Sequence, residues 1–332
     1  SVKGDGKLQV DSTPSGAEVM LWEFEEAGDG VSTPVKPLSL GVTPVATINL
    51  RKGNYLLTFQ RPGHSEVRYP VRIDHSESER VDVFLPDVFP AGTVYVPAGP
   101  AYVGGVQARY YRLHETRVPG FFIGRQEVTF AEYIEFWREQ AGRGQGATDM
   151  SRVRLSLDDR VFRDAWDDDG KLMGLLRPDM PVVGITYASA FRYCTWLGSR
   201  LGVACRLPTA VEWEKAARGV DGRRYVWGDR FSATFAFTVE NVAARQEFGL
   251  FAPPMSLPFD RSVYGAWDMA GNVREWTSTR FDDGSPFFKI KGGSASTPRN
   301  FLQCSAESEF PAAPSDVGFR YVFPLEVSSG SR

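Results

Sequence analysis

The chain has 332 residues, of which 42% are hydrophobic and 24% charged, a composition typical of a folded protein rather than a disordered one. Single hydrophobic cores stop growing at about 250–300 residues, so this length favours two domains. The formal net charge of -3 provides no basic field for a polyphosphate, so we expect no nucleic-acid partner.

Membrane and thiol signals are weak. No apolar run reaches about 18 residues, so we expect no membrane-spanning segment in this fragment. The chain opens at Ser1 without a methionine or a signal-like apolar stretch, which we interpret as a processed or excised fragment. The cysteines Cys194, Cys205 and Cys304 lack CxxC spacing, so a zinc site is not expected. The three histidines are scattered, and we interpret them as ordinary surface residues.

Residues 6–85 are short β-rich runs separated by glycine and proline turns, the pattern of a small antiparallel β-sandwich. We assign this domain to residues 1–86. Three motifs in it resemble the PEGA domain: PSGA at 14–17, GVTP at 41–44 and LRKGNY at 50–55. PEGA modules occur in bacterial surface or extracytoplasmic proteins, so the resemblance implies an extracytoplasmic binding or spacer domain.

A linker at 87–92 leads into a second domain, which we assign to residues 93–332. Two capping boxes and one amphipathic stripe predict helices over 130–142, 210–219 and 187–201. The capping boxes are Thr129 with Glu132 and Thr209 with Glu212. The predicted buried stripe consists of Tyr187, Ala190, Phe191, Cys194, Leu197 and Leu201. Cys194 on that stripe is expected to be a small buried hydrophobe, unbridged to Cys205.

Regular periodicity fades after residue 220, and about a hundred residues are loop rich in tryptophan, glycine, asparagine and proline. Loops of such length in a compact domain are usually functional or are held by something such as an ion. The acidic run DDDG at 167–170 mimics part of an EF-hand. Its first and twelfth ligand positions would be Ala165 and Leu176, so we interpret it as a solvated loop instead.

Eight motifs in order resemble the formylglycine-generating enzyme (sulfatase-modifying factor) superfamily. They are PAGPAYVGG (97–105), VPGFFIGRQEVTFAEYIEFW (118–137), PVVGITYASAFRYCTWLGSRLG (181–202), RLPTAVEWEKAARG (206–219), YVWGD (225–229), YGAWDMAGNVREWT (264–277), KGGS (291–294) and GFR (318–320). The resemblance implies an α+β fold, an elaborated C-type-lectin-like domain, which here follows the small N-terminal antiparallel β-sandwich.

The enzymes of this superfamily oxidise a substrate cysteine with oxygen and monovalent copper, which a C-x4-C pair binds between the GGS and GFR motifs. Here that interval holds only Cys304. The first ligand position falls on Arg299 in one alignment and on Leu302 in another, and neither supplies a second thiolate, so copper is not expected. Cys304 is the only remnant catalytic candidate. It is either a reactive thiol whose pKa Arg299 lowers, or a packed small residue.

The same resemblance implies a calcium ion bound by the stretch DMAGNVRE. Its ligands would be the side chain of Asp268, the carbonyls of Gly271 and Val273, and the carboxylate of Glu275. Hard oxygen donors on a short turn suit calcium. Alternatively, the two carboxylates only cap a turn between two inward-packed tryptophans. A second family site, beginning at Asn241–Val242, lacks a recognisable acidic partner and is expected to be lost.

The loop at 295–316 combines aromatic and adaptable polar residues, as binding surfaces do. Arg274 also stands where many family members have tryptophan, beside the substrate pocket of the enzymes. The expected ligand-binding residues are Arg274, Arg299, Asn300, Phe301, Gln303, Glu307, Glu309 and Phe310.

Three functions are compatible with these features. The first is a non-catalytic module that recognises an unknown protein or small molecule, with a diversified variable protein as one form of it. The second is a metal-dependent oxidase or oxygenase of altered chemistry. The third is the sensor part of a bacterial signalling protein or surface lipoprotein. We favour ligand recognition outside the cytoplasm, in the periplasm or at the cell surface, which is compatible with the sensor as well.

Overall fold

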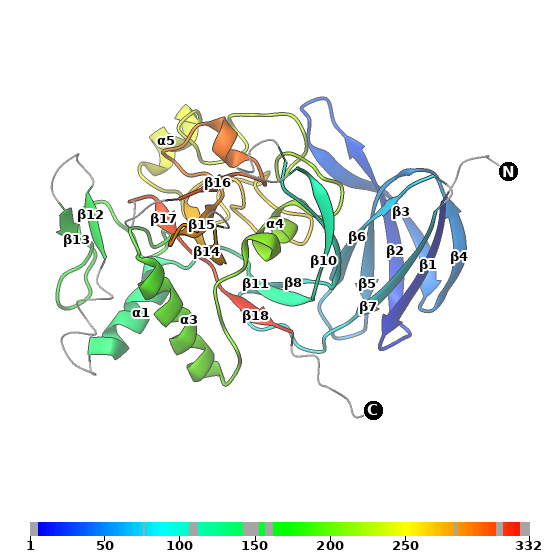
Figure 1. Ribbon diagram of the computed structural model, residues 1–332, viewed down its shortest axis with the longest axis horizontal. Coiled ribbons are helices and arrows are strands. Elements are labelled where there is room, and N and C mark those ends of the chain that lie inside the picture. The colour runs from blue at the N-terminus through cyan, green and yellow to red at the C-terminus, as the bar shows by residue number, and fades with distance from the viewer. Residues whose placement is uncertain are drawn as a thin grey trace.

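The computed structural model describes residues 6–75, 77–105, 112–141, 153–156, 162–281, 284–309 and 315–325. A sandwich of two sheets forms one end of the molecule, and the helices and most of the irregular chain form the other (Figure 1). Among the described residues, no helix is long and apolar enough to cross a membrane.

The N-terminal sandwich has a three-stranded sheet in the order β4-β1-β7 and a four-stranded sheet in the order β3-β2-β5-β6. The pairings are antiparallel, as predicted, except that β1 and β7 run parallel. Inward-facing residues alternate along β1, where Leu8 and Val10 are fully buried. The strands are β1 (Gly6–Thr13), β2 (Glu18–Glu26), β3 (Ser32–Val42), β4 (Val45–Leu50), β5 (Gly53–Gln60), β6 (Val67–Ile73) and β7 (Ser78–Phe84).

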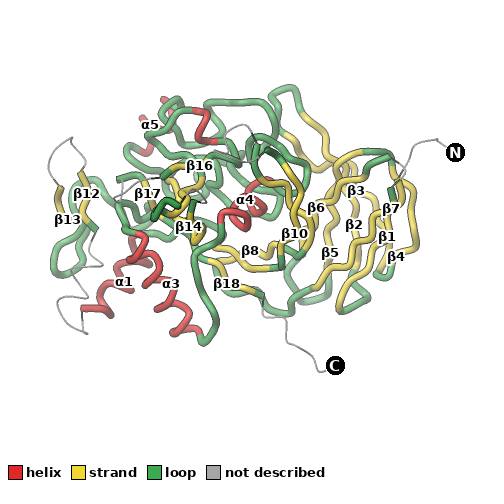
Figure 2. Tube along the Cα trace, in the orientation of Figure 1, coloured by secondary structure: helices red, strands yellow, loops and turns green. Residues whose placement is uncertain are grey.

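The second domain contains short strands joined by extensive loops (Figure 2). Its largest sheet has the order β16-β15-β14-β17, and a three-stranded sheet has the order β18-β11-β8. The strands are β8 (Thr93–Val96), β9 (Gly99–Val103), β10 (His114–Val118), β11 (Phe121–Gly124), β12 (Arg154–Ser156), β13 (Phe162–Asp164), β14 (Arg274–Arg280), β15 (Phe288–Lys291), β16 (Glu307–Ser308), β17 (Val317–Gly318) and β18 (Val322–Pro324).

The three predicted helices are confirmed, and the two predicted capping boxes form. Thr209 accepts a hydrogen bond from the backbone N–H of Glu212, whose side chain accepts one from the N–H of Thr209. Thr129 and Glu132 exchange the same pair of bonds. The helices are α1 (Phe130–Ala141), α3 (Tyr187–Leu201), α4 (Ala210–Arg218), α5 (Val242–Phe248) and the 3-10 helix η1 (Arg299–Leu302).

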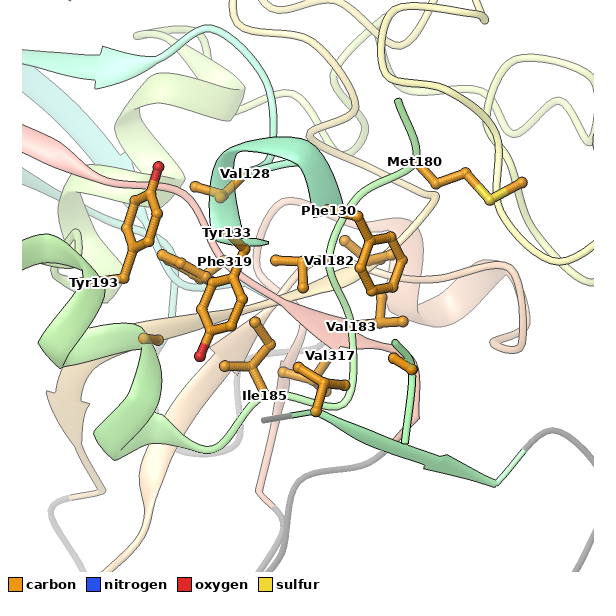
Figure 3. Packing of buried hydrophobic residues seen from close by; sticks show 14 of the residues in the cluster. Val128, Phe130, Tyr133, Met180, Val182, Val183, Ile185, Tyr193, Val317 and Phe319 are labelled. Atoms are coloured by element: carbon orange, nitrogen blue, oxygen red, sulfur yellow. The ribbon is translucent and has the colours of Figure 1, made fainter. Parts of the chain in front are cut away.

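The buried face of α3 differs from the predicted stripe. Phe191 and Leu201 are 52% and 53% exposed, whereas Tyr193 and Trp196 are buried. The reason is the packing of α3 against α1, where Tyr193 stacks on Tyr133 with ring centroids 5.8 Å apart. Figure 3 shows these two tyrosines beside Phe319 in the main core of the second domain. Residues of β17 and of the segment between α1 and α3 also belong to this core.

The two ends of the molecule share apolar cores. Val31 and Leu56 of the sandwich belong to the core around α4, and Phe122 and Phe323 of the second domain belong to the sandwich core. Backbone contacts reinforce this packing, since the Ser32 N–H donates to the carbonyl of Trp227 at 2.7 Å. The sandwich is therefore packed on the second domain rather than hanging from it by a linker.

Candidate functional site

Cys304 lies inside the second domain, not on its surface. The residue is fully buried, and its backbone N–H donates to the carbonyl of Arg224 at 2.9 Å. Burial raises the pKa of its thiol to about 11, against the opposing charge of Arg218. Arg299 points elsewhere, with its guanidinium 5.4 Å from the ring centre of Phe231. The hypothesis that Arg299 activates this thiol is therefore wrong.

A buried ion network surrounds the thiol. Glu214 on α4 binds the ammonium group of Lys291 at 2.9 Å and the guanidinium of Arg218 at 3.2 Å. The same carboxylate accepts the backbone N–H of Gly104 at 2.8 Å. Two cations beside one carboxylate disfavour a further positive ion here. This network connects the end of β9 to α4 and to β15, so we interpret it as structural.

Several of the predicted ligand-binding residues are buried inside the domain instead of lying at its surface. Arg274 is 5% exposed and pairs with Asp316, its Nε donating to Oδ2 at 3.2 Å. Glu307 pairs with Lys289 at 3.2 Å, and both side chains are nearly buried. Gln303 is also buried. Arg274 and Glu307 therefore hold the loop together, and neither offers a free charge to a ligand.

Arg299, Asn300 and Phe301 lie at the surface on η1, with Arg299 exposed and the other two half-buried. The carboxylate of Glu240 accepts the backbone N–H of Arg299 at 3.0 Å and so fixes the start of the turn. Arg224 is exposed on the adjoining loop. We call these residues, with Phe231, the Arg299 surface. Of the remaining predicted residues, Glu309 is half-buried and Phe310 lies outside the described residues.

A second cluster lies around the DMAGNVRE stretch, and its centre is an ion pair. Oε2 of Glu275 accepts a hydrogen bond from Nε of Arg320, and Oε1 accepts one from Nη2, both at 2.7 Å. The indole N–H of Trp213 donates to the same carboxylate at 2.9 Å. Glu275 therefore uses three of about four lone-pair sites and keeps one on Oε1.

Three more buried carboxyl groups share the charge of Arg320. Burial, and then Asp268, raise the pKa of Glu127 well above its ordinary value, and its Oε2 has no hydrogen-bond partner among the described residues. Burial raises the pKa of Asp260 to about 7, although the N–H groups of Ala270 and Gly271 donate to it. Burial and Asp260 raise the pKa of Asp268 to about 8. This centre therefore has more buried carboxyl groups than cations.

The backbone of the stretch is held in a tight form. Asp268 and Asn272 have φ values of 56° and 66°, in the left-handed region that Asp and Asn tolerate. A Cβ at Gly271 would lie 2.6 Å from the carbonyl oxygen of Phe237, so only glycine fits. The Asn272 amide donates to the carbonyl of Ala252 at 3.2 Å and accepts its N–H at 3.1 Å. The Gly-Asn step thus serves close packing.

The oxygen donors expected to bind calcium can be compared with the contacts that each already makes. Within the part of the chain that the structure describes, Gly271 and Val273 are buried residues whose carbonyl oxygens accept no hydrogen bond. Asp268 accepts the Met255 N–H on Oδ2 at 2.7 Å and has Oδ1 to spare. Orphaned buried carbonyls beside an excess of carboxylate suit a hard cation. No cluster of three or more His, Cys, Asp or Glu that could hold a metal occurs among the described residues, so such a site would depend on the two carbonyls.

Sequence reasoning missed Glu127, Asp260 and the role of Arg320. Arg320 was visible as the end of the GFR motif, but the motif does not reveal its partner. Asn272 and Glu127 are 145 positions apart, and their side chains lie 3.3 Å from each other. No local pattern marks such a contact, because a lone acidic residue beside apolar ones reads as a turn or surface position.

The short-stranded, loop-rich α+β architecture, with a buried GFR arginine under the DMAGNVRE turn, defines a formylglycine-generating-enzyme-like domain of C-type-lectin-like fold. Residues 86–325 match the family described as Sulfatase-modifying factor enzyme 1-like domain, and the chain belongs to this family. The predictions of fold class and family are confirmed.

Curated relatives have diverse names. The chain is 33% identical over 185 residues to hercynine oxygenase of Mycolicibacterium thermoresistibile, covering 50% of this chain and 37% of the relative. It is 31% identical to the serine/threonine-protein kinase Pkn1 of Chlamydia trachomatis, with 63% and 31% covered. It is 29% identical to the inactive C-alpha-formylglycine-generating enzyme 2 of Mus musculus, with 48% and 43% covered. The matches span less than half the length of these relatives.

Solved structures share the fold. PvdO from Pseudomonas aeruginosa aligns with a TM-score of 0.56 and 24% identity over 70% of this chain and 94% of that one. CarF aligns with a TM-score of 0.52 and 24% identity, covering 72% and 100%. The Treponema denticola variable protein 1 aligns with a TM-score of 0.50 and 16% identity, covering 80% and 98%. At these identities the likeness concerns the fold alone.

Proposed function

We propose that this protein is a non-catalytic recognition module that binds a protein or small molecule through the Arg299 surface. The observation that carries the proposal is the state of Cys304. The interval between the GGS and GFR motifs holds this single cysteine, which is enclosed and whose pKa is raised to about 11. A soft monovalent copper ion favours two accessible thiolates, and this interval supplies neither an exposed thiol nor a pair.

The Arg299 surface has the composition of a recognition site. The Arg299 guanidinium lies on the Phe231 ring, which limits its rotamer freedom and leaves its N–H edges to meet a partner. Arg224 adds a second exposed guanidinium, and Phe301 adds a half-buried aromatic edge. Aromatic anchors and arginines carry most of the energy in protein interfaces, which supports recognition by this surface.

Calcium has a structural role in this proposal. Asp268, the carbonyls of Gly271 and Val273, and Glu275 would hold the ion, which would offset the excess of buried carboxylate. The turn supports the loop that carries the recognition surface. The N–H of Gly293 donates to Ala270 and that of Ala295 donates to the Asn272 carbonyl, both at 2.9 Å. A bound ion would thereby stiffen the base of the loop that leads into η1.

An extracytoplasmic location is part of the proposal. The PEGA-like motifs of the sandwich support it, because such modules serve outside the cytoplasm in bacteria. The family also includes kinase-named relatives, which suits a sensor within a longer signalling protein. Cell fractionation, with protease protection of the full-length protein in intact spheroplasts, tests the location. If the protein resists the added protease until the inner membrane is broken, the extracytoplasmic location is contradicted.

The first experiment separates recognition from catalysis. Reduced protein is titrated with monovalent copper and with ferrous iron, and oxygen consumption is followed with cysteine-containing peptides and with hercynine, the compound in the name of one relative. We expect no stoichiometric copper binding and no turnover, with Cys304→Ala behaving as the parent protein. Turnover that Cys304→Ala abolishes would restore the competing function, an oxidase with an unusual one-cysteine site.

The second experiment addresses the surface itself. The protein is screened on peptide and glycan arrays, and each ligand found is retested with Arg299→Ala and Phe231→Ala. Loss of one central arginine typically weakens an interface by about 2 kcal/mol or more, roughly thirtyfold. Arg177→Ala, at an exposed arginine paired with Asp179, is the matched control. Ligands that bind both surface variants as tightly as the parent would place recognition elsewhere.

A further inference from the structure

A cavity of about 460 Å³ lies at the junction of the two domains, far in sequence from the Arg299 surface. Strands β6 of the sandwich and β8 of the second domain lie side by side at this junction (Figure 1). The volume falls in the range of small-molecule sites, about 300–1,000 Å³. Its walls come from five stretches of chain: residues 65–68 at the start of β6, residues 89–95 leading into and along β8, Arg125 directly after β11, Met255, and the 261–267 turn.

Three arginines line this cavity: Arg68 from β6, Arg125 directly after β11, and Arg261. Glu66 is the single acidic residue in the lining, so the formal charge of the described wall is two positive. Arg68 is held in place, since its Nε donates to the carbonyl of Val263 at 2.7 Å and its Nη1 to Glu66 at 3.1 Å. Neither Arg125 nor Arg261 has a carboxylate at ion-pair distance among the described residues.

Hydrogen bonds hold the backbone at Arg261 and at Arg125. Arg261 and Trp267 face each other as an antiparallel bridge, closed by the Ser262 N–H on the Ala266 carbonyl at 2.7 Å. The Arg261 guanidinium lies 5.3 Å from the Trp267 ring centre. Arg125 is pinned on both sides, because its N–H donates to Gly92 and its carbonyl accepts the N–H of Trp267. The backbone positions of Arg125 and Arg261 are therefore fixed relative to each other, which lowers the cost of bringing both to one ligand.

Three guanidinium groups with one carboxylate among them leave positive charges that an anion would balance. Partial burial, and then the charges of Arg68 and Arg125, lower the pKa of Arg261. Guanidinium forks match the oxygens of phosphate, and two net positive charges match the double charge of a phosphate monoester near neutral pH. The rings of Trp267, Tyr264 and Phe89 supply an aromatic wall for the organic part of such a ligand.

We propose that the interdomain cavity is a binding site for small phosphate monoesters, with Arg125 and Arg261 on the phosphate and Trp267 against the organic group. A second cavity of about 330 Å³ is also lined by Arg68 and Arg261, so these two guanidinium groups border space on two sides. The ligand would contact both domains at once, so its binding would resist their separation.

Isothermal titration calorimetry with phenyl phosphate in low-salt, phosphate-free buffer tests the site, with inorganic phosphate and benzoate as further probes. We expect phenyl phosphate to bind more tightly than either, because only it combines the double charge with a ring. Arg125→Ala and Arg261→Ala should each weaken binding roughly ten- to hundredfold, the loss typical for one charged hydrogen bond. Both side chains are exposed and lack ion pairs in the described structure, so both variants should fold normally.

The control is Arg177→Ala, at an exposed arginine that does not line the cavity and should leave binding unchanged. Unchanged melting temperatures would show that the cavity variants are folded. Three results would each overturn the proposal. The first is no heat of binding with phenyl phosphate up to about 10 mM. The others are an affinity in Arg125→Ala and Arg261→Ala equal to that of the parent protein, or a loss of affinity in Arg177→Ala as large as in those two variants. Benzoate binding as tight as phenyl phosphate would overturn its charge requirement.

Discussion

Arg320 and Glu275 form an ion pair in which both side chains are fully buried, with two N–O distances of 2.7 Å. Arg320 also donates to the carbonyls of Gly124 and Trp267, at 3.1 and 2.9 Å. One guanidinium thus ties β14 to β11 and to the start of the DMAGNVRE turn. It is also the positive charge that the neighbouring carboxyl groups share.

Replacing this arginine should cost more than losing the pair alone. In Arg320→Met, Glu275 would remain buried without its cation, beside Asp260 and Asp268. Removing one partner of a buried pair destabilises a protein by about 3–5 kcal/mol. We expect a loss of at least this size in urea-induced unfolding. The control, Arg200→Ala, removes an exposed pair with Glu135 and should cost less than about 1 kcal/mol. Similar losses in the two variants would contradict the central role of Arg320.

Calcium should raise the melting temperature of the parent protein relative to the protein in chelator. An ion present at a hundred times its dissociation constant stabilises the folded state by about 2.7 kcal/mol. Asp268→Asn removes one of the two proposed carboxylate ligands and should abolish most of this shift, whereas Asp167→Asn in the exposed acidic loop should preserve it. Differential scanning calorimetry measures both. A parent protein indifferent to calcium, or an Asp268→Asn variant with the full shift, would show that Arg320 and protons alone balance these carboxyl groups.

The sequence predicts local features of this protein well. The Thr209 capping box forms as expected because both of its bonds are made within one helical turn. The motif order likewise identifies the family and thereby the fold. The outcome differs on α3, where Phe191 is exposed and Tyr193 buried, because contact with α1 decides which face is covered.

The side-chain pairs of the candidate site are harder to predict. The sequence predicts Arg274 as a ligand-binding residue beside the substrate pocket of the family. In the structure it pairs instead with Asp316, which is 42 positions away, and Arg274 is buried. Cys304 has an arginine five positions before it in the sequence, but η1 turns Arg299 toward Phe231. Both outcomes depend on where irregular chain folds back on itself, which no periodicity records.

The thiol of Cys304 should be unreactive in the folded protein. With a pKa near 11, about one thiol in a thousand or fewer is ionised at pH 7.5, and the group is fully buried. We expect iodoacetamide to leave Cys304 unmodified over hours in native buffer and to modify it within minutes in guanidinium chloride, as peptide mass spectrometry would show. Rapid native labelling of Cys304 would contradict the enclosed geometry and weaken the case against catalysis.

Lys215 should make stability increase with pH. Its ammonium group is buried and donates to the carbonyls of Pro97 and Gly99, and burial lowers its pKa to about 7. An unfolded lysine keeps its proton up to about pH 10.4. Between these values the unfolded state binds more protons, so the free energy of unfolding should rise with pH, by up to about 4 kcal/mol. In Lys215→Met this contribution should vanish, so parent and variant are compared by urea unfolding at pH 7, 8.5 and 10. Parallel pH curves would mean that Lys215 stays charged in the fold, held by the carbonyl oxygens around it.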